Sequence, residues 1–122
     1  MRAVPPPPEW LEDWYAVAEY ADTSTEEIVQ KYAKDFKEAT GEAGELYGAT
    51  YYGAFQAVVA ALENGAEPTS ESLYNALKEI ENVPGILGSL TCDKDRSLMH
   101  DALLVQIKDL VPQVVDTFTA EF

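Results

Sequence analysis

The sequence predicts an α+β domain that is mainly helical, with three principal helices, an N-terminal strand and a C-terminal β-hairpin. Apolar residues recur at helical spacing in three separate segments, and a short aromatic run with β-prone residues precedes them. The last third of the chain holds extended apolar runs separated by polar residues. With 122 residues and 47% hydrophobic content, the chain can bury a core without metals or disulfides.

The N-terminal region divides into a proline-rich leader and the start of the domain. Residues 1–13 are expected to be a leader or linker remnant, and residues 14–122 a single domain. The four prolines at 5–8 favour a stiff polyproline segment that cannot join a helix or a central strand. Residues 14–20 are aromatic and β-prone and alternate between two faces, so they predict a strand.

The first helix is expected to follow Ser24 and to end near Thr40 and Gly41. Ser24 is the predicted cap, because its hydroxyl can accept from the backbone of Glu27 while the Glu27 side chain reaches back to Ser24. One apolar stripe marks the buried face, and it consists of Ile28, Val29, Tyr32, Ala33 and Phe36.

The second helix is expected between about Gly44 and Asn64. Its apolar residues surround most of the helical circumference, so the pattern predicts that the helix is largely buried. Small residues permit close approach of neighbouring backbone, and they are Gly48, Ala49, Gly53, Ala54 and Ala57. The pair Asn64-Gly65 provides a left-handed stop.

A third helix is expected after Pro68, capped by Thr69 or Ser70 and ending before Pro84. Its apolar positions are Leu73, Ala76, Leu77 and Ile80.

The C-terminal third is predicted to be extended. Residues 86–91 and 102–108 are expected to pair as a hairpin around a polar turn at 93–97. Residues 111–118 are ambiguous, because Pro112 suits the first turn of a helix whereas Val114 and Val115 favour a strand. Of the two, we favour the helix.

The charge balance restricts the partners. Eight Lys and Arg against 22 Asp and Glu give a net charge of −14, which repels nucleic acid and anionic lipid surfaces. No apolar run is long enough to span a bilayer, and the segment that starts at Met1 has no hydrophobic secretion signal. The chain is therefore expected to be soluble, and either cytoplasmic or a trimmed piece of a longer precursor.

No set of residues predicts an enzyme or a cofactor site. His100 is the only histidine and has no second ligand nearby in the sequence, so a solvent-exposed loop or strand-start role is expected. Cys92 is the only cysteine, and the default interpretation is a small packed thiol at a strand end. The segment 93–104 resembles a calcium loop only at its start, because Leu98 and Leu104 replace the required glycine and glutamate.

Tyrosines offer the one candidate for ligand binding. They combine apolar area with a hydroxyl that can fix a polar ligand group, although core packing is the expected role for most of those between 47 and 52. Tyr47 is the exception, because it lies in the first turn of the second helix, where side chains and free amides can face a cleft.

Taken in order, these segments resemble the C-terminal portion of the type I periplasmic solute-binding proteins, of the branched-chain amino acid type. The resemblance covers most of residues 14–111. The segments that carry it are 14–20, 27–36, 46–55, 70–80, 83–93 and 104–109.

The resemblance implies a binder and not a catalyst. In that family two α/β lobes close on a small amino acid, such as leucine, isoleucine or valine, and pass it to an ABC permease. The aromatic residue at the start of the tyrosine-rich helix is a ligand-contact position in the family, so Tyr47 is expected to contact ligand, with Gly48 and Ala49 near the cleft. A periplasmic or extracellular location follows from the same resemblance.

The family's two-lobed body is much longer than this chain. The sheets on which these helices normally pack have no counterpart here, so an apolar patch is expected at the surface and homo-oligomerisation through the exposed helix faces is expected with it. Two alternatives stay open: a standalone helical oligomerisation module that binds no ligand, and an enzyme that depends on Cys92.

Overall fold

The computed structural model describes residues 8–119, and these form three α-helices and two small sheets, as the predicted fold class requires. The helices are α1 (Glu27–Thr40), α2 (Leu46–Glu63) and α3 (Ser70–Lys78), after a short 3-10 turn, η1 (Glu9–Leu11). The strands are β1 (Tyr15–Ala18), β2 (Val83–Gly85), β3 (Gly88–Cys92), β4 (Leu98–Met99), β5 (Ala102–Lys108) and β6 (Val111–Phe118).

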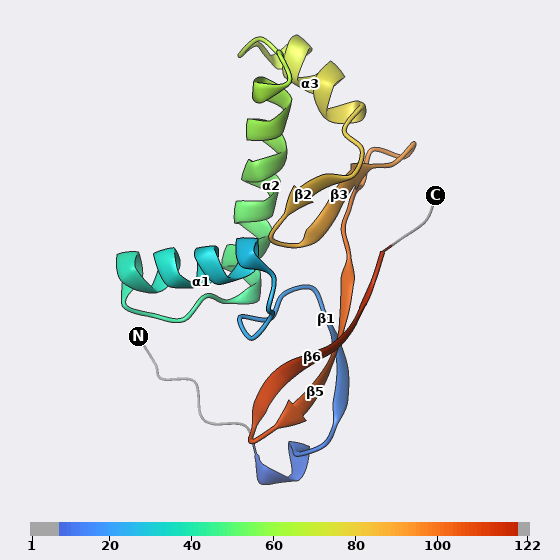
Figure 1. Cartoon of the computed structure of the whole chain (residues 1–122). Helices are drawn as coiled ribbons and strands as arrows, with labels where there is room; N and C mark the ends of the chain where they lie inside the picture. Colours follow the sequence, from blue (N-terminus) through green and yellow to red (C-terminus); the bar gives the residue numbers. More distant parts are fainter. Residues whose placement is uncertain (1–7, 120–122) are drawn as a thin grey trace.

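Both sheets are antiparallel, with strand orders β1-β5-β6 and β2-β3-β4. Figure 1 shows α1 crossing the N-terminal end of α2, with α3 at the other end of α2 and the β2–β3 hairpin alongside. The β1-β5-β6 sheet extends away from the helices. The polyproline prediction falls mostly on residues outside the described range, and the boundary at residue 14 stays a prediction.

Helix α1 has the predicted stripe and stop but a different start. Val29 and Tyr32 are buried, and Gly41 ends the helix at φ +79°. The predicted capping box is wrong, because the helix begins at Glu27 and the cap residue is Glu26. The Ser24 hydroxyl instead accepts from the amide of Glu26 at 3.3 Å, as a turn residue does before the helix.

Helix α2 is not largely buried, which corrects the prediction. Only one stripe of small residues at four-residue spacing is buried, and it consists of Ala49, Gly53, Ala57 and Ala61. Because these side chains are small, α2 lies close to its neighbours; a methyl group on Gly53 would be 3.1 Å from Leu87 Cδ1. Gly65 follows the helix at φ +97°, as predicted.

Helix α3 is capped by Thr69, whose hydroxyl accepts from the amide of Ser72 at 3.3 Å. This agrees with the prediction of Thr69 or Ser70 as the cap.

The C-terminal strands pair differently from the prediction. Residues 88–92 pair with β2 and β4, whereas 102–108 pair with β1 and β6, so these two runs do not form a hairpin with each other. The polar turn at 93–97 joins β3 to β4, where Asp93 Oδ1 accepts from the amides of Asp95 and Ser97. The side chain thus closes the turn together with two backbone hydrogen bonds, from the Asp93 amide to the Ser97 carbonyl and from the Arg96 amide to the Asp93 carbonyl.

Residues 111–118 form strand β6 and not the helix that we favoured. Asp109 and Leu110 both have positive φ, 52° and 61°, which makes the tight two-residue turn of a β-hairpin. The Glu12 carboxylate accepts from both of their amides, at 2.8 and 3.0 Å. Pro112 is tolerated because β6 is an edge strand.

The core lies where α1, α2 and the β2–β3 hairpin meet. Leu90 of β3 is its largest fully buried side chain. The buried members of the cluster are Tyr20, Val29, Tyr32, Ala49, Ala57, Ile80, Ile86, Leu87 and Leu90.

Candidate functional site

The outer face of α2 is aromatic and open to solvent. Tyr47, Tyr51 and Phe55 lie on successive turns and are 72%, 80% and 63% exposed. Tyr52 and Leu62 are also partly exposed. Because residues four apart share one side of a helix, the three aromatic rings form a continuous stripe, which we call the aromatic face. An apolar surface of this kind is typical of an interface with another part of a protein or with a ligand.

The three predicted site residues lie on different sides of α2. Tyr47 is exposed in the first turn, whereas Ala49 is fully buried in the core. Gly48 faces α1, since a methyl group there would be 3.1 Å from the Tyr32 hydroxyl. Of the three, Tyr47 is therefore the one with an exposed side chain; Gly48 is partly buried against α1 and Ala49 lies in the core.

Two buried tyrosines support the start of α2. The rings of Tyr20 and Tyr32 meet edge to face with centroids 5.8 Å apart, and neither hydroxyl has a hydrogen-bond partner. Burial raises the pKa of Tyr20 to about 12, and the nearby Asp22 carboxylate adds to the effect. Burial also raises the pKa of Tyr32. Both tyrosines are neutral at physiological pH. They pack against the chain at the start of α2, where a methyl group on Gly44 would be 2.9 Å from the Tyr20 hydroxyl and one on Gly48 would be 3.1 Å from the Tyr32 hydroxyl.

The N-terminus of α2 is not capped by a side chain. The cap residue, Glu45, is extended and its carboxylate makes no capping hydrogen bond. The amides at a helix start carry partial positive charge, so the first turn beside Tyr47 can favour an anionic ligand group.

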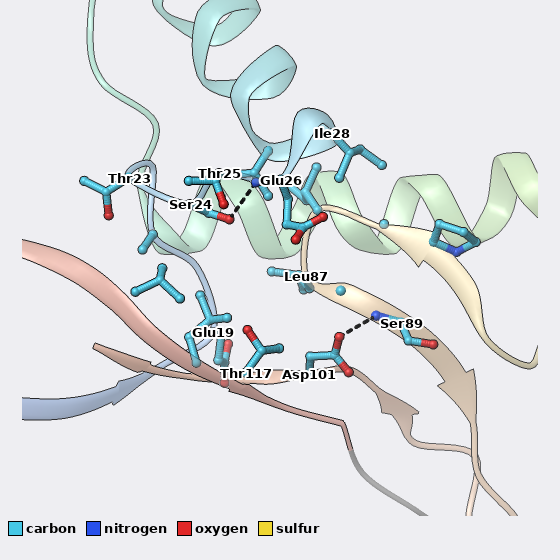
Figure 2. A pocket seen from close by; sticks show the side chains of 18 of the residues that line it. Glu19, Thr23, Ser24, Thr25, Glu26, Ile28, Leu87, Ser89, Asp101 and Thr117 are labelled. Carbon is cyan, nitrogen blue, oxygen red and sulfur yellow. Dashed lines mark hydrogen bonds between the residues drawn. The ribbon is translucent and has the colours of Figure 1, made fainter. Parts of the chain in front are cut away.

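A second candidate region is a cavity of about 500 Å³ that sequence reasoning missed. It lies between the start of α1, the β2–β3 turn and strands β5 and β6 (Figure 2). Its polar lining includes Glu19, Thr23, Ser24, Thr25, Glu26, Asn82, Ser89, Asp101 and Thr117. These residues come from distant parts of the sequence, and no local motif marks them.

Cys92 lies at a strand end and His100 in a loop, as expected, but His100 is half-buried and not solvent-exposed. Cys92 ends β3 and packs, half-buried, against the core. His100 lies in the loop between β4 and β5, and its Nε2 is 4.0 Å from Glu19 Oε1. Over residues 8–119, no group of three or more His, Cys, Asp or Glu side chains is arranged to hold a metal ion. None of the helices in that range is long and apolar enough to cross a membrane.

The family of the chain follows from comparison with known proteins. A family model described as periplasmic binding protein matches residues 3–110. The chain belongs to the periplasmic binding protein family. No curated protein matches the sequence.

Solved structures of periplasmic binding proteins share the fold. A putative branched-chain amino acid ABC transporter protein from Rhodospirillum rubrum aligns with a TM-score of 0.78 at 20% identity, over 88% of this chain and 32% of that one. A leucine-binding protein from Thermotoga maritima aligns with a TM-score of 0.67 at 16% identity, over 89% of this chain and 31% of that one. An ABC transporter substrate-binding protein from Desulfitobacterium hafniense, in complex with Leu, aligns with a TM-score of 0.71 at 20% identity, over 86% of this chain and 32% of that one.

The periplasmic binding protein described here thus spans about a third of the length of these relatives. At such identities the likeness establishes the fold, which is part of the type I periplasmic-binding architecture that the sequence predicted.

Proposed function

We propose that the chain is part of the substrate-binding component of an ABC uptake transporter and contributes to binding a small amino acid such as leucine, isoleucine or valine. It acts by binding and not by catalysis, outside the cytoplasmic membrane, and passes its ligand to a permease. The family and the ligand named for the Desulfitobacterium relative support this proposal. The observation that carries it is the exposure of Tyr47, 72%, at the uncapped start of α2.

Tyr47 is the proposed ligand contact. Its ring can pack on an aliphatic side chain, and the adjacent helix amides favour the ligand carboxylate. Gly48 and Ala49 have a supporting role in this proposal: Gly48 lies against Tyr32 and Phe36 of α1, and Ala49 is buried in the core, so both help to fix the position of Tyr47.

The aromatic face is the proposed contact with the rest of a two-lobed body. The relatives are about three times as long as this chain, so most of their fold has no counterpart in it. In the isolated chain we propose that a second copy covers the same face, because three adjacent exposed aromatic side chains favour association.

A standalone interaction module is the second candidate. The aromatic face would then bind another protein surface and no amino acid. The two candidates differ in whether leucine binds.

Leucine binding is expected to depend on Tyr47. In a chemical-shift titration with leucine, Tyr47→Ala should weaken the affinity at least about tenfold, because a central aromatic anchor is removed. The thermal midpoint should hardly change, since the side chain is 72% exposed. Tyr74→Ala on α3 is the matched control and should bind leucine like the wild type; Tyr74 is 45% exposed.

Two outcomes contradict this proposal. One is leucine affinity that Tyr47→Ala leaves unchanged. The other is the absence of shifts with leucine, isoleucine and valine alike, which favours the interaction module.

A further inference from the structure

The charged side chains that line the cavity between α1 and the β5–β6 strands are all acidic. Three carboxylates line it, those of Glu19, Glu26 and Asp101, and the lining includes no Lys, Arg or His. Figure 2 shows Glu26 on one wall and Asp101 on the opposite wall, below Ser89. The start of α1 at one wall adds the partial positive charge of its amides, equivalent to about half a charge, which is less than three carboxylates. On balance the cavity attracts cations and repels anions.

Asp101 is the most enclosed of these acids. It is only 9% exposed, and its Oδ2 accepts from the amide of Ser89 at 3.0 Å. Its own amide donates to the carbonyl of Leu87 at 3.0 Å, which holds the residue against the β2–β3 turn. The second oxygen, Oδ1, is buried without a hydrogen-bond partner. A buried carboxylate with a free oxygen is costly unless a donor or an opposite charge compensates it.

The carboxylates of Glu19 and Glu26 are more exposed than that of Asp101 and need no partner within the cavity. The side chain of Glu19 is 48% exposed and lies 4.0 Å from His100, and Glu26 is exposed at the start of α1. Solvent screens both charges. The preference of the cavity for a cation thus rests mainly on Asp101.

Much of the remaining wall is apolar. Aliphatic side chains come from α1, the β2–β3 turn and the two long strands, and they are Ile28, Val29, Ile86, Leu87, Leu103 and Val114. A volume of about 500 Å³ lies within the range that holds small organic ligands.

We propose that this cavity binds a small primary alkylammonium ion, with the ammonium on the Asp101 side and the alkyl group against the aliphatic wall. An ammonium has three donors and no acceptor, which suits a wall of carboxylates and hydroxyls. A zwitterionic amino acid fits poorly, because no lining cation balances its carboxylate. The site is separate from the aromatic face, and the proposal does not depend on the transport function.

The test compares three ligands that share the isobutyl group of leucine and differ in their charged groups. Isoamylamine is leucine without its carboxylate, and isocaproate is leucine without its amine. In a chemical-shift titration of the full chain, isoamylamine should shift the amides of Ser89 and Asp101, whereas leucine and isocaproate should leave them in place.

Asp101→Asn should weaken isoamylamine binding at least about tenfold, because the amide oxygen can still accept from Ser89 while the charge is lost. Glu71→Gln, at an exposed position on α3, removes the same charge elsewhere and should have no effect. Tyr47→Ala should also leave isoamylamine binding unchanged, which separates this site from the leucine site.

A second variant covers the case in which Asp101→Asn fails to fold. Thr117 is exposed on the edge strand β6 and lines the cavity, so Thr117→Arg should place a cation at its mouth and abolish the shifts. The proposal is overturned if isoamylamine shifts no cavity amide in the wild type, or if it binds Thr117→Arg with unchanged affinity.

Discussion

Leu90→Ala is expected to lower the free energy of unfolding by about 2–5 kcal/mol, the range for truncating a buried leucine. Leu90 has 0% exposure in β3 and packs in the cluster that joins the β2–β3 hairpin to the helices. Its Cδ1 would lie only 3.0 Å from a methyl group on Gly85, so the surroundings are already tight. Loss of the side chain leaves a cavity, because the closely packed neighbours can move into the empty space only in part. Urea denaturation followed by circular dichroism measures the effect.

Leu98→Ala is the matched control for this prediction. Leu98 lies on β4 of the same sheet but is 36% exposed, so less apolar area is lost and no closed cavity forms. We expect a loss below about 1.5 kcal/mol. Equal losses for the two variants would contradict the assignment of Leu90 to the core.

Gly88→Ala is expected to destabilise the chain by about 3 kcal/mol or more, because two costs coincide. Gly88 has φ +85°, a left-handed conformation that disfavours any side chain. The new methyl carbon would also lie 2.0 Å from Asp101 Oδ2 and 2.6 Å from Asp101 Cβ. The β2–β3 turn must then move away from β5, and the hydrogen bond from Ser89 to Asp101 is lost. The same denaturation experiment measures the change.

Gly65→Ala separates these two costs. Gly65 has a similar φ of +97°, but a methyl group there meets nothing within 4 Å. Its cost should be that of the backbone alone, about 1–2 kcal/mol. If Gly88→Ala lowers the free energy of unfolding no more than Gly65→Ala does, Asp101 does not pack closely against the β2–β3 turn as described.

Local signals in the sequence predicted most of the helical structure. The apolar stripe of α1 and the stops at Gly41 and Gly65 follow from side-chain spacing and from the conformational freedom of glycine. The cap of α3 at Thr69 was likewise predictable. Each of these features depends on residues within one or two turns of one another.

Strand pairing was not predictable in the same way. Residues 86–91 and 102–108 are both extended and apolar, and nothing local shows that the second run pairs with β1 at the other end of the chain. Pro112 suited the first turn of a helix. A proline is also tolerated in an edge strand, but the local sequence does not show that residues 111–118 form the edge of a sheet. The Ser24 cap failed because the turn before α1 continues two residues further than expected.

The burial of α2 was misread because both of its faces are apolar. Hydrophobicity does not distinguish Ala57, which is buried, from Phe55, which is exposed, whereas side-chain size does. The cavity at Asp101 was missed for another reason. The partner of its carboxylate is the amide of Ser89, twelve residues away, and the β3–β4 hairpin lies between the two residues in the sequence.

The aromatic face of α2 is the feature on which the proposed place of this chain in a larger binding-protein body depends. Hydroxyl-radical footprinting with mass spectrometry measures it directly, in dilute and concentrated samples. In dilute protein Tyr47, Tyr51 and Phe55 should be oxidised much faster than the buried Tyr20 and Tyr32, and the difference should shrink as copies associate at high concentration. If the α2 aromatics are as protected as Tyr20 and Tyr32 in a dilute monomer, the aromatic face does not exist as described.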